Sequence, residues 1–261
     1  MRVPIYQVDA FTNRRFAGNP AAVCPLESWL PDATLQVIAA ENNLAETAFV
    51  VPQGEEYSLR WFTPKVEVDL CGHATLATAF VLRKMLGRQE EELRFQTRSG
   101  LLTVTAAGEA LTLDFPALPP IPTDPPVWLP AALGGEPQGF WRATDYLALY
   151  PDEAAIRALQ PDLRALASVE ARGVIVTAPG EECDFVSRFF APGAGIDEDP
   201  VTGSAHCTLT PFWSERLGKN PLLARQISLR GGELHCRLAG DRILITGEAV
   251  LYLEGQIYLD E

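Results

Sequence analysis

The sequence predicts an α+β fold of two pseudo-repeated domains, each a set of strands wrapped around one buried helix. Three observations predict it. Short runs rich in β-branched and aromatic residues alternate along the chain, a proline-rich segment divides it near the middle, and two similar apolar helical segments lie half a chain length apart. A chain of 261 residues is long enough for two domains with separate cores.

Strand-like runs fall on both sides of the proline-rich segment. They cover 3–9, 20–25, 46–52, 57–63, 92–97, 101–106 and 110–115 before it, and 139–149, 173–178, 183–190, 225–230 and 242–259 after it. An early helix is predicted over 32–41, with Asp32 as its cap and Leu35, Ile38 and Ala39 on one face. A second is predicted over 152–168.

The domain boundary is predicted at the segment PALPPIPTDPPVW, whose six prolines favour an extended connector without ladder donors. This gives an N-terminal domain over 1–116, a linker over 117–128 and a C-terminal domain over 129–251. The last strand, 252–261, is a candidate addition to the N-terminal domain.

The two helical segments are CGHATLATAFVLRKMLG and GSAHCTLTPFWSERLG. Each helix begins at a glycine, Gly72 or Gly203, and closes with Leu-Gly, where the last glycine suits a left-handed C-terminal position. Both are apolar nearly all round, which predicts burial on every face. The first N–H groups of a buried helix suit a carboxylate or an enolate oxygen, so we expect both helix starts to face one interdomain cleft.

Composition excludes several classes of protein. With 34 acidic against 21 basic residues, the net charge of -13 disfavours nucleic acid and anionic membranes as partners. A leader or membrane-spanning segment is not evident, so a cytoplasmic location is expected. The five scattered cysteines form no C-x-x-C pair, which predicts reduced thiols, no disulfide framework and no metal site.

Four blocks of the chain together resemble the phenazine-biosynthesis isomerase-like (PhzF-like) family, which shares the diaminopimelate epimerase fold. The blocks are DAFTNRRFAGNPAAV, NNLAETAFV, RWFTPKVEVDLCGHATLATA and DEDPVTGSAHC, and they span most of the chain in the family's order. The resemblance implies two domains, each a curved, mostly antiparallel sheet around a central helix. It also implies a homodimer, no cofactor and no metal, and a small carboxylate-like substrate held between the domains.

The resemblance also implies roles for single residues. Glu46 matches the family's general acid/base, which shuttles a proton between carbons, and His73 and Asp199 are the other catalytic candidates. The predicted substrate-binding residues are Asn19, Gly72, Gly203 and Ser204.

Each catalytic candidate also has a purely structural interpretation. Glu46 could be a solvated acid at a strand start, although the apolar residues after it favour burial and a raised carboxyl pKa. Asp199 could cap a helix with Pro200 at its first position. His73 lies near a helix N-terminus, which favours a neutral ring suited to a site, whereas an isolated histidine at such a position is more often structural.

Two other functions stay open. The first is a cofactor-independent racemase or epimerase that uses Cys71, which resembles the first thiol of the related epimerases; the DPVTGS turn places Asp199 where a second thiol would be wanted. Cys207 falls one turn inside its helix. The second is a noncatalytic small-molecule binding protein. The residues favour an isomerase that transfers a proton between carbons.

Overall fold

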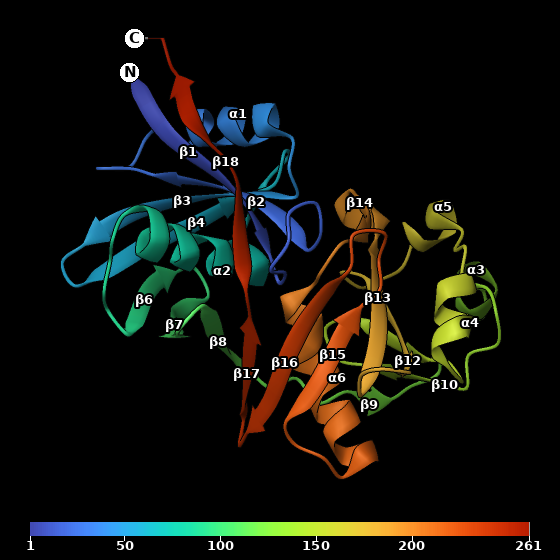
Figure 1. Cartoon of the computed structure of the whole chain (residues 1–261). Helices are drawn as coiled ribbons and strands as arrows, with labels where there is room; N and C mark the ends of the chain where they lie inside the picture. Colours follow the sequence, from blue (N-terminus) through green and yellow to red (C-terminus); the bar gives the residue numbers. More distant parts are fainter. Residues whose placement is uncertain (261) are drawn as a thin grey trace. The chain divides into compact units, whose positions relative to one another are not determined.

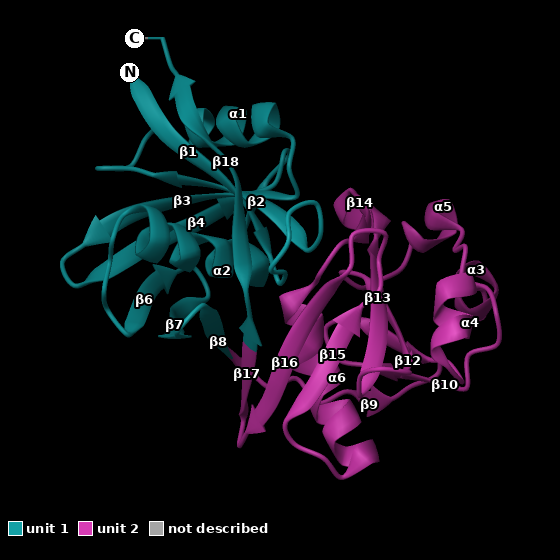
Figure 2. Cartoon of the chain, in the orientation of Figure 1, with its two compact units in different colours: residues 1–114, 246–261 teal, residues 115–245 magenta. Residues whose placement is uncertain are grey.

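The computed structural model describes residues 1–260 and divides into two compact units (Figures 1 and 2). Unit 1 comprises Met1–Asp114 and the C-terminal segment from Thr246, and unit 2 comprises Phe115–Ile245. The proline-rich segment belongs to unit 2, where its short strand β9 pairs with β10.

Unit 1 is a mixed, mostly antiparallel sheet. Its strands pair in the order β18-β1-β2-β3-β4-β6-β7-β8, and only β2/β3 and β4/β6 are parallel. Each parallel pair requires a crossover, and the helices α1 and α2 supply them. The elements are β1 (Arg2–Ala10), β2 (Asn19–Pro25), α1 (Asp32–Asn42), β3 (Glu46–Gln53), β4 (Glu56–Phe62), β5 (Glu67–Val68), α2 (Gly72–Phe80), β6 (Glu92–Thr97), β7 (Gly100–Ala107), β8 (Ala110–Pro116) and β18 (Ala249–Tyr258).

Unit 2 repeats this arrangement. Its strands pair in the order β9-β10-β11-β12-β13-β15-β16, with β11/β12 and β13/β15 parallel. The elements are β9 (Ile121–Pro122), α3 (Leu129–Leu133), β10 (Gly139–Arg142), β11 (Tyr146–Leu149), α4 (Glu153–Ala158), α5 (Leu163–Leu166), β12 (Val174–Pro179), β13 (Phe185–Ala191), β14 (Ile196–Asp199), α6 (Gly203–Leu217), β15 (Leu222–Gln226), β16 (Gly232–Ala239) and β17 (Arg242–Gly247).

The two units correspond strand by strand. The strands β1 to β4 match β10 to β13, the short β5 matches β14, and β6 and β7 match β15 and β16. The helix α2 follows β5 as α6 follows β14, and each crosses to the next parallel strand. The predicted α+β fold with an internal repeat is therefore confirmed.

The central helix of unit 1 begins at Gly72, as predicted, and its eight residues from Gly72 to Ala79 are all buried. It contacts β1, β2, β3 and β18. A helix buried on all sides can contain polar groups only if they are satisfied internally. Thr75 Oγ1 donates to Cys71 O (2.5 Å) and Thr78 Oγ1 donates to Ala74 O (2.7 Å), so both hydroxyls are satisfied within the helix.

The central helix of unit 2 begins at Gly203, also as predicted, and ends at a left-handed Gly218. Pro211 lies inside it and lacks an N–H, which leaves the carbonyl of Cys207 without its usual helical donor. Leu118 N, from the proline-rich segment, donates to that carbonyl (2.9 Å). The segment therefore satisfies a buried group of the helix as well as connecting strands.

Several predicted elements are wrong in detail. Asp32 does not cap α1; the cap position is Pro31, and the Asp32 carboxylate accepts from Arg60 (2.9 Å) instead. The helix predicted over 152–168 is two short helices, because Pro161 and the extended Leu159 interrupt it. The strand predicted over 225–230 runs from Leu222 to Gln226.

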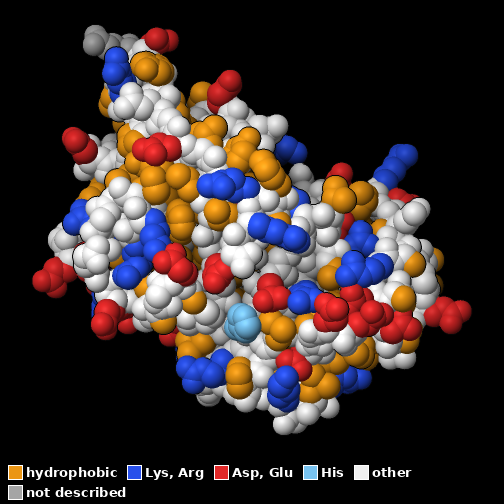
Figure 3. Space-filling model, in the orientation of Figure 1, with side chains coloured by type: hydrophobic (Ala, Val, Ile, Leu, Met, Phe, Trp, Pro, Cys, Tyr) orange, Lys and Arg blue, Asp and Glu red, His pale blue; other side chains and the backbone are white. Residues whose placement is uncertain are grey.

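The distribution of charged side chains and the length of the helices both bear on the expectations from composition. Acidic and basic side chains are interspersed over the face shown in Figure 3. Within residues 1–260, no helix is both long and apolar enough to cross a membrane.

A close contact beneath α2 generates a stability prediction. A Cβ added at Gly247 would lie 2.5 Å from the Phe11 ring, which is fully buried and has a left-handed backbone (φ 61°). We expect Gly247→Ala to lower the free energy of unfolding by about 1–3 kcal/mol, since the ring has no room to move.

Urea unfolding of the variant checks this expectation. Gly255→Ala is the matched control on the next strand, β18, because its added Cβ meets Ile5 at an ordinary 3.8 Å. Equal stability of the two variants would contradict the close contact.

Candidate active site

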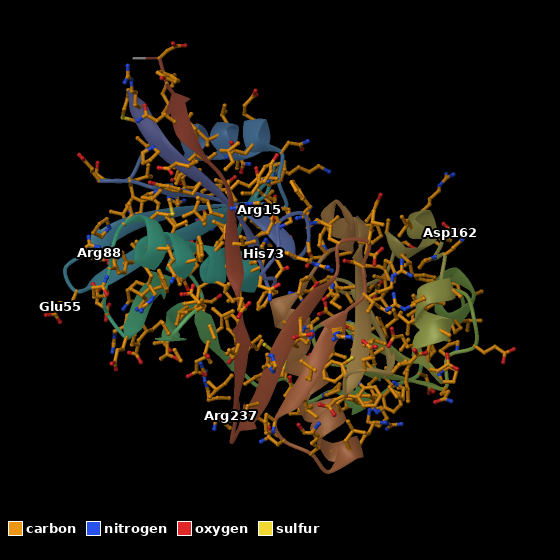
Figure 4. The ribbon with its side chains drawn as sticks, viewed as in Figure 1. Arg15, Glu55, His73, Arg88, Asp162 and Arg237 are labelled. Carbon is orange, nitrogen blue, oxygen red and sulfur yellow. The ribbon has the colours of Figure 1, made fainter. Side chains whose placement is uncertain are left out.

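Four predicted residues come together in unit 1 around the His73 ring, labelled in Figure 4. His73 Nε2 lies 3.2 Å from Glu46 Oε2, and its Nδ1 lies 3.2 Å from Asn19 Nδ2. Cys71 Sγ lies 3.5 Å from the same Nδ1. The side chains of His73 and Glu46 are 5% and 12% exposed, so the cluster is almost withdrawn from water.

The topology explains this convergence. Asn19 begins β2 and Glu46 begins β3, and these strands are parallel neighbours with Ala21 opposite Glu46. The starts of parallel strands lie at one edge of a sheet, so both side chains lie there. His73 is the second residue of α2, the helix packed on these strands.

Burial fixes the charge of His73. It lowers the pKa of the imidazole to about 3, from an ordinary value of about 6.5. The neutral ring predicted from the sequence is therefore confirmed, with desolvation as the main cause.

The hydrogen bonds also define the tautomer. The Asn19 amide NH₂ donates to Nδ1, which must then be the unprotonated nitrogen. The proton therefore resides on Nε2, which faces the Glu46 carboxylate. Asn19 orients the ring, and Nε2 lies 3.2 Å from the Glu46 carboxylate.

A second cluster lies in unit 2 around the turn that precedes α6. Thr202 Oγ1 donates to Asp199 Oδ2 (2.5 Å), and both residues are buried. The buried Gln226 side chain fixes this turn, because its Nε2 donates to Asp199 O (2.7 Å) and its Oε1 accepts from Thr202 N (2.8 Å). Asp199 is the last residue of β14 and Thr202 is the cap position of α6, so the interpretation of Asp199 as a helix cap is wrong.

Ser204, the second residue of α6, belongs to a network that the sequence did not predict. Arg172 Nη1 donates to Ser204 Oγ (2.7 Å). The same guanidinium makes a two-pronged contact with Asp145, through Nε to Oδ1 (3.0 Å) and through Nη2 to Oδ2. Asp145 is 1% exposed, and burial opposes the charge on Arg172 while the bonds to Asp145 raise its pKa overall.

The two clusters occupy matching places in the repeat. Asn19 and Glu46 begin β2 and β3, and Asp145 and Arg172 come just before the corresponding strands β11 and β12. His73 and Ser204 are each the second residue of the central helix, preceded by Gly72 and Gly203. The repeat therefore has an acid and an imidazole in unit 1, and a guanidinium and a hydroxyl in unit 2.

The cap positions of the central helices correspond as well. Cys71 precedes Gly72 and Thr202 precedes Gly203, so a hydroxyl and not a second thiol stands opposite Cys71 in the repeat. Cys207 lies inside α6, where burial raises the pKa of its thiol to about 12. The shared interdomain cleft stays a prediction.

Comparisons with known proteins agree with this arrangement. The chain matches the phenazine biosynthesis-like protein (PhzC-PhzF) family over residues 8–124 and 141–255. An uncharacterized isomerase of Pseudomonas aeruginosa is 53% identical over 259 residues, which cover 99% of this chain and 100% of the relative. The crystal structure of a PhzF-family phenazine biosynthesis protein from Enterococcus faecalis has a TM-score of 0.97 at 48% identity, covering 99% of this chain and 100% of the other. A predicted epimerase of Pseudomonas aeruginosa, at 21% identity and a TM-score of 0.80, shares the fold.

The neutral imidazole generates a pH prediction. Because the folded pKa of His73 is about 3, its NMR ring signals should not titrate between pH 5 and 8. The unfolded chain takes up this proton near pH 6.5, so the stability contribution of His73 is complete above about 6.5 and declines as the pH falls toward 3. The signals are assigned by their loss in His73→Gln; an inflection near pH 6.5 would contradict the buried, neutral state.

The Arg172–Asp145 contact generates a stability prediction. Arg172→Ala leaves the carboxylate of Asp145 buried and unpaired, which should cost about 3 kcal/mol of folding free energy. Arg225→Ala is the control, because its partners Glu182 and Glu233 are exposed and its loss should cost less than about 1 kcal/mol. Denaturant unfolding compares the two; an equal loss would show that Asp145 does not depend on Arg172.

Proposed function

Since the chain belongs to the phenazine biosynthesis-like (PhzF-like) family and is an isomerase, we propose that it moves a proton between carbons of a small unsaturated or carbonyl-bearing carboxylic acid. Glu46 is the general acid/base in this proposal. It removes a proton from an activated carbon and returns it to another carbon of the same molecule.

The observation that carries this assignment is the contact between Glu46 and a neutral His73. With a pKa of about 3, the imidazole is protonated in only about one molecule in 10⁴ at pH 7, so it is a poor carrier for a proton taken from carbon. The carboxylate 3.2 Å away is the group that can accept the proton and hold it as a neutral acid. His73 is then a positioning residue, whose ring lies against one oxygen of Glu46 while the other is left for substrate.

The remaining groups suit a carboxylate substrate. The first N–H groups of α2 and α6 have no acceptor within their own helices, and Gly72 and Gly203 permit close approach to them. In α6, Ala205 N already donates to Thr202 O (3.2 Å), which leaves the amides of Gly203 and Ser204 for a ligand. Because Ser204 Oγ accepts from Arg172, its own proton is free to donate. Such donors stabilise the delocalised anion that forms when the proton leaves carbon.

A racemase or epimerase that uses Cys71 is the second candidate function. The observation that favours it is the 3.5 Å contact between Cys71 Sγ and His73 Nδ1, which places a thiol beside the acid/base cluster. Inversion at one carbon requires an acid or base on each face, and Thr202 stands where the repeat would need the second thiol. The acid Asp199, which accepts from the Thr202 hydroxyl, is then the opposing base.

The primary test follows solvent deuterium into carbon. Purified protein in D₂O is incubated with a panel of small unsaturated and carbonyl-bearing carboxylic acids, and exchange at carbon is followed by proton NMR. For an acid that exchanges, Glu46→Gln should reduce the rate by about 100-fold or more, because an amide keeps the shape of the side chain but cannot accept the proton.

Glu67→Gln is the matched control, since Glu67 lies in the same unit with a similarly buried side chain (11% exposed) but pairs with Arg60. Its exchange rate should stay within about threefold of wild type. Glu46→Gln with wild-type exchange would refute the general-base assignment. Binding of a panel acid without exchange would instead identify a noncatalytic binding protein, and loss of exchange in Cys71→Ser with retention in Glu46→Gln would identify the epimerase.

A further inference from the structure

Unit 1 contains three potential metal ligands close together, Glu46, Cys71 and His73. The proposed proton transfer does not explain why all three lie in one cluster. A carboxylate oxygen of Glu46, Cys71 Sγ and a ring nitrogen of His73 all lie within 4.8 Å of one another. Among the residues that the structure describes, this is the one such group of three or more His, Cys, Asp or Glu side chains. We propose that this cluster is an inhibitory Zn²⁺ site.

The ligand types fit zinc better than other common divalent ions. Thiolate and imidazole together select zinc over magnesium and calcium, which prefer oxygen ligands only. Three protein ligands with a fourth position open is the arrangement found in exchangeable and catalytic zinc sites. The single carboxylate of Glu46 completes a Cys, His and Glu set.

The distances are close to those of a tetrahedral site. Zinc bonds of about 2.0–2.3 Å place neighbouring ligand atoms roughly 3.3–3.7 Å apart. A zinc ion takes one ring nitrogen of His73, and Nε2 is the candidate, because Glu46 Oε2 lies 3.2 Å from it. Cys71 Sγ is 3.5 Å from the other ring nitrogen, Nδ1, so the thiolate must turn toward the Nε2 side to reach the same ion. The widest separation, 4.8 Å, requires the ligand atoms to close by about 1 Å, which a side-chain rotation of Glu46 or Cys71 can supply.

The protein backbone around the cluster preorganises it. Glu46 begins a central strand, Cys71 is the cap residue of α2 and His73 is held by Asn19 (3.2 Å), so each ligand comes from a packed element. When Nε2 binds the metal, Nδ1 carries the ring proton, and a turn of the Asn19 amide brings its Oδ1 to accept that proton, as outer partners of ligating histidines do.

Comparison of the two repeated units indicates how many zinc sites the chain has. The corresponding positions in unit 2 are Arg172, Thr202 and Ser204, a cation and two hydroxyls, which are not zinc ligands of this kind. The inference is therefore one zinc ion per chain, in unit 1.

Zinc bound here would stop the reaction proposed for Glu46. The binding step has no redox change: the Cys71 thiol releases its proton to buffer, the ring proton of His73 moves from Nε2 to Nδ1, and lone pairs of sulfur, Nε2 and a carboxylate oxygen occupy the metal. The Glu46 oxygen on zinc can no longer take a proton from carbon. The inhibition rests on the proposed function, whereas the binding does not.

The test measures the metal directly, without substrate. Protein stripped with a chelator and kept reduced with a phosphine is titrated with Co²⁺, whose bond to a thiolate gives a near-ultraviolet charge-transfer absorption, and Zn²⁺ is then titrated by calorimetry. We expect one equivalent of each ion, with Zn²⁺ displacing Co²⁺. Cys71→Ser should lose the thiolate absorption and weaken Zn²⁺ binding by at least about tenfold.

Two control variants keep the result specific. Cys183→Ser removes a less buried thiol that bonds Phe185 O, and His235→Ala removes an exposed imidazole 3.8 Å from Glu233; both should bind Zn²⁺ like wild type. Circular dichroism confirms that each variant is folded. A missing cobalt–thiolate absorption, unchanged Zn²⁺ affinity in Cys71→Ser, or loss of binding in either control would overturn the site.

The same experiment separates this inference from the proposed function. If Zn²⁺ binds at Cys71 and also stops deuterium exchange, both hold. If it binds there and no acid exchanges in its absence, the metal site holds and the proposed function fails. If exchange depends on Glu46 but Cys71→Ser binds Zn²⁺ like wild type, the proposed function holds and the metal site fails.

Discussion

Each unit depends on one central helix that is buried on every side over most of its length. The mostly buried stretches, Gly72–Ala79 and Gly203–Trp213, contain no Asp, Glu, Lys or Arg, and several of their polar groups bond the helix's own backbone. The hydroxyls of Thr75, Thr78 and Thr210 do so, and the His206 ring contacts Thr202 O (2.8 Å) in the same way. The helix start is the one place where unsatisfied backbone donors remain, and both clusters of polar side chains gather there.

The repeat places different polar side chains at matching positions of the two units. In unit 1 the side chains at the strand starts and the helix start are an amide, an acid and an imidazole, and burial keeps the imidazole neutral. In unit 2 the matching side chains are Asp145, Arg172 and Ser204, in which the guanidinium donates to both the acid and the hydroxyl. One topology therefore holds two clusters of different chemistry.

The sequence predicted the fold class because its main signals are local. Strand alternation, the proline-rich segment and the two glycine-led apolar helices are each read within about 20 residues, and the positions of Gly72 and Gly203 as helix starts were correct. The errors arose where contacts between residues distant in the sequence determine the local structure. Asp32 accepts a hydrogen bond from Arg60 of strand β4 instead of capping its helix, and the strand β16 was missed.

The site was predicted only in part, for a related reason. Asn19, Glu46, Cys71 and His73 could be named from short motifs, because each lies in a block with recognisable residues around it. Arg172 could not, since its partners Asp145 and Ser204 lie 27 and 32 residues away and a single arginine before a strand is not distinctive. Gln226 is similar: its two bonds to the Asp199–Thr202 turn bridge residues 24 and 27 positions apart. Recognition of the repeat is the signal that would have found Arg172, by asking what stands opposite Glu46.

The pairing of the first and last strands affects how the chain is made. The strand β18 pairs with β1 along its length, Arg2 lies opposite Tyr258, and the N-terminal amine of Met1 donates to Leu259 O (2.7 Å), so the two termini lie side by side (Figure 1). During synthesis, all of unit 2 is available to fold before β18 exists. The sheet of unit 1 can be completed only after β18 has been synthesised. Until then the edge of β1 that β18 covers has no partner strand, and an unpaired edge of this kind is prone to pair with other chains.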